Sequence, residues 1–335
     1  MFQTEVNHFF QSFASEGLTR FMVFVTSLGY MEFFMIFLIV LLLGIHFKKT
    51  FLLFQVLLWT AAITFFFKEY FNLPRPFHVD NTIQLLDRQL PDEEVFDLEK
   101  KGALNFWDAL PDDVLETTRK SSDLQNGFPS GHSSIAIAFW AAVAFLFRRW
   151  WITVVTVSLM ILIPISRLYL GVHFLADVLG GVALGAMVFG LFYLIILRPR
   201  QLDGYLSKSN YPIGVNWPTG LLILPAFLLM PILSTTVYAL MAFMLGIGLG
   251  FLLLGQKGLP LDAGTAGQRI GRTVLGLVLF AGIRFFLGWL GTKIGMETNV
   301  WYDFFRNTLA GLVLIWISVE LSIRLGWFQR TTSSV

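Results

Sequence analysis

The sequence has no cysteine among its 335 residues. This excludes disulfide bonds, a thiol nucleophile, and any metal centre or cluster held by cysteine. Charged residues are also scarce, at 14%, whereas 56% of the residues are hydrophobic and the mean hydropathy is +0.69. Soluble domains carry about 25% charged residues. The composition therefore excludes an ordinary soluble protein, and we expect a membrane protein with no nucleic-acid partner.

What the chain has instead is a series of long apolar runs. A helix needs about 20 apolar residues to cross roughly 30 Å of hydrocarbon. The run at 220–255 is too long for one span and is interrupted by prolines, so it predicts two antiparallel helices. We expect an all-α, polytopic transmembrane helix bundle of about nine spans: 21–44, 51–72, 131–147, 151–169, 174–197, two within 220–255, 273–291 and 303–325.

Residues 1–20 have a different pattern. Phenylalanines alternate with polar residues at roughly helical spacing, which predicts an amphipathic helix lying in the membrane interface. A frayed terminus is the alternative interpretation.

The distribution of charge predicts the orientation. Lysines and arginines gather in the short loops on one side of the nine spans, which the positive-inside rule assigns to the cytoplasm. The opposite, outer side then holds the N-terminus and the hydrophilic loop 77–128, where twelve acids against five bases give a net charge of −7. A solvated exterior domain is the simplest interpretation of this loop. Residues 201–217 are the best candidate for a linker, so we expect a core over 1–200 and additional transmembrane helices over 201–335.

Three polar clusters lie at the outer ends of the predicted spans. Ionisable residues are costly in a membrane and frequently mark functional sites. Each cluster also has a structural explanation: basic side chains can extend to the headgroups, Pro-Ser-Gly can form a turn and a helix cap, and a His–Asp pair can hold a helix end. The clusters are Lys68 with Arg75, then Pro129-Ser130-Gly131-His132, and finally Arg167, His173 and Asp177.

Brought together, the clusters would form an anion site that contains a nucleophile. The basic side chains would surround the oxygens of a phosphate, and the N–H groups of a helix that starts at Ser130 and Gly131 would add to the cradle. The carboxylate of Asp177, four residues after His173, can hold that imidazole as a nucleophile. His132 on another helix can act as general acid. Phosphate-binding candidates are Lys68, Arg75, Ser130, Gly131 and Arg167. This arrangement requires no cofactor and no metal, and the histidines do not have the placement of a three-ligand zinc site.

The order Lys-x6-Arg-Pro, Pro-Ser-Gly-His and Ser-Arg-x5-His-x3-Asp resembles the three-part signature of the type 2 phosphatidic acid phosphatase family, which comprises membrane lipid phosphatases related to haloperoxidases. The matching segments are 68–76, 129–132 and 166–177, with no signature position substituted. The resemblance implies the same residue roles and covers roughly residues 1–200. The rest is loosely similar to larger bacterial members and to sphingosine phosphate phosphatases. We therefore expect a bacterial inner membrane protein with its active site on the periplasmic face.

The expected substrate is a lipid monophosphate or diphosphate that reaches the site laterally through the membrane. Phosphatidic acid, phosphatidylglycerol phosphate, a sphingoid base phosphate, undecaprenyl diphosphate and a lipid A phosphate all remain open. A phosphotransferase that passes the phosphoryl group to an acceptor lipid is the alternative enzyme, and a transporter or scaffold that binds phosphate without turnover is the non-enzymatic one. Arg284 and Glu320 in the late spans are candidates for an intramembrane pair or a second site. The sequence leaves the oligomeric state open.

Overall fold

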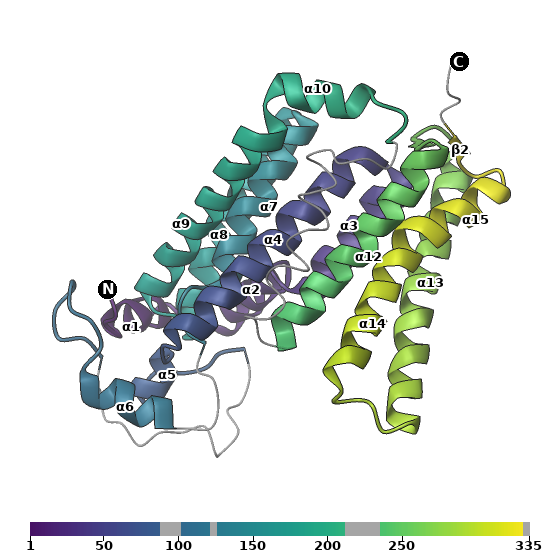
Figure 1. Cartoon of the computed structure of the whole chain (residues 1–335). Helices are drawn as coiled ribbons and strands as arrows, with labels where there is room; N and C mark the ends of the chain where they lie inside the picture. The colour runs from purple at the N-terminus through teal and green to yellow at the C-terminus, as the bar shows by residue number, and fades with distance from the viewer. Residues whose placement is uncertain (88–101, 121–125, 212–234, 331–335) are drawn as a thin grey trace. The chain divides into compact units, whose positions relative to one another are not determined.

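The computed structural model describes residues 1–87, 102–120, 126–211 and 235–330, and nearly all of its regular structure is helical (Figure 1). The chain divides into two compact units. One contains residues 1–34 and 59–192, and the other contains residues 35–58 and 193–335. The two long helices α3 (Met31–Gly44) and α4 (Phe47–Phe71) contribute to both.

The first unit contains all three polar clusters of the sequence. Its remaining helices are α1 (Glu5–Gln11), α2 (Glu16–Ser27), α5 (Pro76–Val79), α6 (Asp112–Lys120), α7 (Gly131–Phe147), α8 (Trp150–Tyr169) and α9 (Leu175–Phe192).

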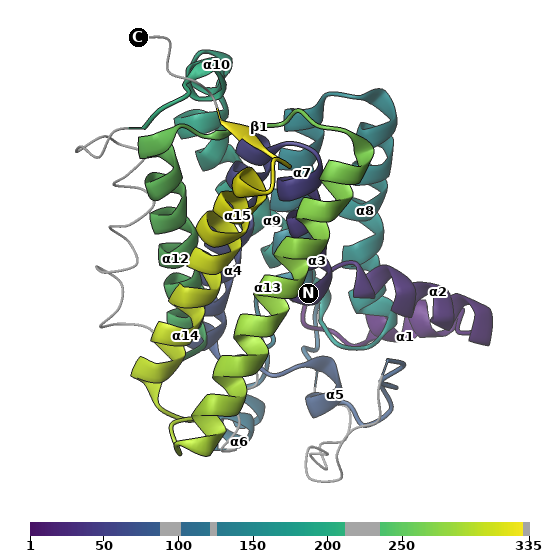
Figure 2. The ribbon, with the colours of Figure 1, turned by 90° about the vertical axis from the view of Figure 1, so that its right-hand side faces the viewer.

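The second unit contains helices that run alongside one another in both views (Figures 1 and 2). Its elements are η2 (Tyr193–Leu197), α10 (Pro199–Ser207), α12 (Thr235–Lys257), β1 (Pro260–Leu261), α13 (Ala266–Lys293), α14 (Val300–Leu312), η4 (Val313–Ile317), α15 (Ser318–Arg324) and β2 (Gln329–Arg330). The two short strands pair antiparallel, with Pro260 opposite Arg330.

The expected count of nine spans is not confirmed. Within the described ranges, six helices are long and apolar enough to cross a membrane, or seven if the bent pair α2–α3 is one span. Helix α7 has only 17 residues, and the first half of the predicted pair within 220–255 lies outside the described residues. The six spans are Phe47–Val79, Trp150–Tyr169, Leu175–Leu197, Val237–Lys257, Ala266–Lys293 and Val300–Arg324.

The span predicted over 21–44 is not one straight helix. The chain instead bends by 56° between α2 and α3. The N–H groups of Leu28, Gly29 and Tyr30 donate to carbonyls three residues back, so the last turn of α2 tightens and stops. Apolar composition continues across the bend, which is why hydropathy alone does not reveal it.

The N-terminal helix is shorter than predicted, but apolar side chains in and beside it are exposed. Helix α1 covers only Glu5–Gln11, whereas the side chains of Phe9 and Phe13 nearby are about 60% exposed. This exposure agrees with a position in the membrane interface.

A buried arginine organises one end of the second unit. Arg272 of α13 donates hydrogen bonds to the carbonyls of Leu43, Ala263 and Trp327, and its guanidinium lies 3.8 Å from the centroid of the Phe328 ring. These acceptors satisfy the charged group without a carboxylate. The motif AGQRIGR at 266–272 is therefore explained by packing within this unit.

Helices α7 and α9 pack closely because the facing surface of α9 is made of small residues. Gly181 and Gly185 lie four residues apart, so they share one face of the helix. A Cβ atom at Gly181 would lie 2.5 Å from the carbonyl oxygen of Ser130, and one at Gly185 would collide with the carbonyl oxygen of Ser134. Such small residues let two helix backbones approach in a membrane. The close approach fixes the start of α7 against the start of α9.

We expect Gly185→Ala to destabilise the protein by about 1–3 kcal/mol, because the added methyl group overpacks this contact. Gly190→Ala on the same helix is the matched control, because no atom lies within 4 Å of the position of its new Cβ. Thermal unfolding in detergent measures both. Equal melting temperatures for the two variants would contradict the packing explanation.

Candidate active site

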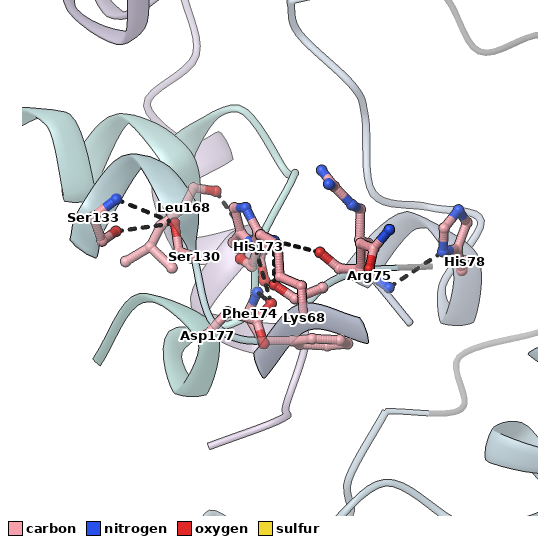
Figure 3. A network of polar contacts seen from close by, with 12 residues as sticks. Lys68, Arg75, His78, Ser130, Ser133, Leu168, His173, Phe174 and Asp177 are labelled. Carbon is pink, nitrogen blue, oxygen red and sulfur yellow. Dashed lines mark hydrogen bonds and ion pairs between the residues drawn. The ribbon is translucent and has the colours of Figure 1, made fainter. Parts of the chain in front are cut away.

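The first unit brings the three polar clusters of the sequence together. Arg167 lies near the end of α8. Lys68 lies near the end of α4, and His173 lies in the connection from α8 to α9 (Figure 3). All three side chains are buried, with 5%, 7% and 2% of their surface exposed. The backbone links the first two clusters directly, because the N–H of Gly127 donates to the carbonyl of Leu73 over 2.7 Å.

His173 and Asp177 form a buried pair. Nδ1 of His173 lies 3.2 Å from Oδ2 of Asp177, and the same oxygen accepts the backbone N–H of Phe174 at 3.0 Å (Figure 3). The pair exists because α8 ends just before it: Gly171 adopts a left-handed φ of +75°, which stops the helix and leads the chain into α9. With Nδ1 directed at the carboxylate, Nε2 is the ring nitrogen left for other chemistry.

His173 is surrounded by positive charge. It lies between the spans Trp150–Tyr169 and Leu175–Leu197. Burial lowers its pKa well below the usual value for histidine, and the charges of Arg75, Lys68 and Arg167 lower that pKa further. The imidazole is therefore neutral at pH 7, which is the state that a nucleophile requires.

The start of α7 presents N–H groups beside this pair. Ser130 is the N-cap: its backbone N–H donates to the carbonyl of Asp177 at 2.9 Å, and its Oγ accepts the hydroxyl of Ser133 at 3.0 Å. The first bond within the helix runs from the N–H of Ser134 to the carbonyl of Ser130. The N–H groups of Gly131 and His132 therefore come before the hydrogen-bonded ladder, at the positive end of the helix dipole. A Cβ at Gly131 would lie 3.6 Å from Cε of Lys68, so the lysine stem passes this helix start.

His132 has a specific environment in the first unit. Its ring packs edge-on against Tyr30, with 4.9 Å between the ring centroids, and Gly29 leaves space for it. Nε2 of His132 is buried and has no hydrogen-bond partner among the described residues. A buried nitrogen without a partner is costly, so it is a candidate for contact with a bound group.

Oxygen atoms of neighbouring segments hold the side chains of Arg167 and Lys68. Nη1 of Arg167 donates to Oγ1 of Thr26 at 2.6 Å, and Nζ of Lys68 donates to the backbone carbonyl of Asn126 at 2.5 Å. The backbone N–H of Arg75 donates to Nδ1 of His78 at 3.2 Å, which starts the short helix α5 (Figure 3). The first two contacts orient the side chains of Arg167 and Lys68, and the third fixes the backbone at Arg75.

Asn7 belongs to none of the three motifs, yet it is fully buried. Its Nδ2 donates to the carbonyls of Leu168 and His173, each at 3.0 Å. In the sequence, Asn7 has the spacing of a water-facing residue on an amphipathic helix. No local signal distinguishes it, because its two acceptors lie more than 160 residues away. Helix α1 therefore holds the backbone of the His173 connection.

The acidic loop is less solvated than predicted in its described parts. Val79, Leu110, Val114 and Phe174 form a buried apolar cluster, so the loop packs against the residue that follows His173. Asp80 is 1% exposed, and its carboxylate accepts the hydroxyl of Thr82 and lies 3.1 Å from Nε2 of His8. Alternating acids and apolar residues conceal this small core, because its members are distant in sequence.

Comparison with known families identifies the chain. Residues 49–201 match the PAP2 superfamily, and residues 238–330 match the PAP2 superfamily phosphatase, transmembrane extension. The chain belongs to the PAP2 superfamily. This match confirms the resemblance based on the three motifs. Together with the six long apolar helices among the described residues, it identifies an integral membrane protein.

Two bacterial relatives match part of this PAP2 chain. Phosphatidylglycerophosphatase B of Bacillus subtilis (strain 168) is 37% identical over 73 residues, which cover 19% of this chain and 36% of that protein. Lipid A 1-phosphatase of Rhizobium johnstonii is 36% identical over 87 residues, which cover 26% of this chain and 34% of that protein. The matches thus span about a third of the length of these relatives.

A solved structure, that of Aquifex aeolicus LpxE, aligns with 57% of this chain and 94% of its own. Its TM-score is 0.43 and its sequence identity to this chain is 20%.

We expect Asn7→Ala to destabilise the protein by about 1–3 kcal/mol, because two buried carbonyls lose their donor. Gln3→Ala removes a solvent-exposed hydrogen bond to the carbonyl of Leu104 from the same region, and we expect it to change stability by less than about 0.5 kcal/mol. Melting in detergent compares the two variants. If Asn7→Ala melted like the wild-type protein, α1 would not hold the His173 connection.

Proposed function

We propose that this chain is a membrane lipid phosphatase that hydrolyses a phosphate or diphosphate monoester through a phosphohistidine intermediate. The observation that carries the proposal is the buried His173–Asp177 pair, whose neutral imidazole lies among the charges of Lys68, Arg75 and Arg167. A neutral nucleophile surrounded by cations suits an anionic substrate, because the cations attract the phosphate without occupying the attacking nitrogen.

In the first step, Nε2 of His173 attacks the phosphorus atom. The bond between phosphorus and the lipid oxygen breaks. His132, which takes up a proton when the anionic substrate offsets the charges of the three cations, gives this Nε2 proton to the departing oxygen. Asp177 accepts a hydrogen bond from Nδ1–H of His173 and stabilises the positive charge that grows on the attacking ring. The unpartnered Nε2 of His132 supports its role as the general acid, because the leaving oxygen would supply its missing hydrogen bond.

In the second step, water attacks the phosphohistidine. His132, now neutral, accepts a proton from the water, the bond between nitrogen and phosphorus breaks, and inorganic phosphate leaves. His173 returns to its starting state and His132 is protonated again. Each half of the reaction therefore uses the same acid and base residue.

The phosphate oxygens would be held throughout by the three cations and the start of α7. Arginine suits this role because its planar fork donates two parallel hydrogen bonds to a phosphate. The oxygen atoms that hold these side chains in the free protein, such as Oγ1 of Thr26 and the carbonyl of Asn126, would be exchanged for phosphate oxygens. Ser130 and Gly131 contribute the positive end of the helix dipole.

A lipid substrate is supported by two independent observations. The named relatives are phosphatases of lipid A and of phosphatidylglycerophosphate. The site residues also lie at or near the ends of apolar helices, where a lipid phosphate can enter from the membrane. We place the catalytic core within residues 1–200 and the additional helices within 201–335. The charge distribution of the loops favours a site on the outer, periplasmic face of a bacterial inner membrane.

We expect His173→Ala to abolish phosphate release from lipid phosphates and Asp177→Asn to lower it roughly 100-fold or more, because the first loses the nucleophile and the second its orienting charge. His46→Ala, which removes a histidine of the second unit, is the matched control and should keep wild-type activity. The measurement is inorganic phosphate released by purified protein in detergent, alongside the melting temperature of each variant. Near-wild-type release by either site variant would rule out the assigned roles. Phosphorylated acceptor lipid in place of free phosphate would indicate a phosphotransferase.

We also expect activity to persist in EDTA, because arginine and lysine neutralise the phosphate charge in this mechanism. Phosphate release is compared before and after extensive chelation, with a known magnesium-dependent phosphatase treated in parallel. A loss of activity that a divalent cation restores would overturn the metal-free mechanism.

A further inference from the structure

Arg284 has a place in the second unit that the phosphatase reaction does not explain. It lies within the span Ala266–Lys293, and its side chain is exposed on the helix surface. Its Nη1 donates to Oδ1 of Asn307 over 3.4 Å, and its guanidinium lies 5.7 Å from the centroid of the Phe280 ring. A long hydrogen bond to a neutral amide compensates little of the cost of a charge in a membrane. The expected pair with Glu320 is not formed, because Glu320 makes an ion pair with Arg330.

The neighbouring helix α14 adds a second arginine at the same place. Arg306 pairs with Asp303 of its own helix at 2.6 Å. Arg306 and Asp303 both act electrostatically on Arg284, so two guanidinium groups and one carboxylate leave a net charge of about +1 around Asn307. The loop that joins α13 to α14 adds no net charge, because the opposite charges of Lys293 and Glu297 balance each other. The excess positive charge therefore belongs to the two arginines.

Two tryptophans indicate the depth of these arginines. Trp289 follows Arg284 by five residues, and Trp301 precedes Arg306 by five residues. At 1.5 Å per residue, each arginine is about 7.5 Å along its helix from the tryptophan. Both tryptophans are more than half exposed, as is typical of aromatic residues at the headgroup level. Arginine stems can extend from this depth toward the headgroups.

The two helices are fixed against each other in this region. The hydroxyl of Tyr302 donates to the carbonyl of Leu287, and Gly291 leaves space for the same ring, because a Cβ there would lie 2.6 Å from it. The two arginines thus stand on adjacent helices whose register is set by packing.

We infer that Arg284 and Arg306 bind the phosphate of an anionic lipid headgroup, with the buried Asn307 positioning Arg284. The excess positive charge matches a phosphate of net charge −1, and guanidinium groups bind phosphate oxygens in pairs. A lipid is favoured over free phosphate because Phe285 and Phe286, beside Arg284, are 78% and 51% exposed and offer an apolar surface to acyl chains. This site is separate from the proposed reaction, because the headgroup it would hold is a phosphodiester that a monoester phosphatase does not hydrolyse.

Native mass spectrometry of the full chain in detergent tests this site with phosphatidylglycerol, a diester of net charge −1, against zwitterionic phosphatidylcholine. We expect the wild-type protein to retain phosphatidylglycerol preferentially, and Arg284→Ala to weaken its apparent affinity by about threefold to tenfold. Lys293→Ala removes a positive charge from the same helix outside the site and should bind like the wild-type protein. Asp303→Asn should strengthen binding, because it releases Arg306 from its carboxylate.

Equal binding of phosphatidylglycerol by the wild-type protein and Arg284→Ala would overturn the inference, as would equal retention of the two lipids. If an equimolar concentration of inorganic phosphate displaced the phosphatidylglycerol, the inference that the site prefers a lipid to free phosphate would be wrong. His173→Ala should retain phosphatidylglycerol as the wild-type protein does. A loss of turnover without a loss of lipid binding therefore separates this site from the proposed phosphatase.

Discussion

The first unit depends on a concentration of positive charge inside an apolar protein. Lys68, Arg75 and Arg167 all act on His173, and burial strengthens their effect. Such charges are tolerated only where oxygen atoms surround them, and in this unit backbone carbonyls and the hydroxyl of Thr26 serve that purpose. The N-terminal helices are therefore part of the site's support. A segment that resembles a simple membrane anchor supplies Thr26 and Asn7, which hold an arginine and the backbone of the histidine connection.

Small residues have a corresponding role in the backbone. Glycines on α9 bring that helix against α7, so that the N-cap Ser130 donates to the carbonyl of Asp177. One close helix contact thus joins the proposed phosphate-binding start of α7 to Asp177, the partner of the proposed nucleophile. The second unit uses a related arrangement, in which Gly291 lets Tyr302 close the α13–α14 hairpin. In both units a glycine contact sets the register in which polar groups meet.

The family and the helical class could be predicted from the sequence because both depend on local patterns. The motifs at 68–76, 129–132 and 166–177 contain residues close in sequence, and apolar runs identify membrane helices without knowledge of their partners. The count of nine spans is not confirmed. Hydropathy does not reveal the bend between α2 and α3 or the short length of α7, because it reflects composition and not the hydrogen bonds that end a helix. The small apolar core of the acidic loop could not be predicted either, because its members are distant in sequence: Val79 and Phe174 are 95 positions apart.

The sequence by itself determined the chemistry that is present: three cations, two histidines and a carboxylate in a chain dissolved in lipid, with no cysteine to supply another reaction. The tertiary structure decided which side chains support them. Asn7 and Thr26 acquire their roles from acceptors and donors that lie more than 140 residues away. Likewise, Arg284 donates a hydrogen bond to Asn307 and does not pair with Glu320. Hydrogen bonds of this kind act over about 3 Å in space, and no local pattern encodes which distant segments folding will bring within that distance.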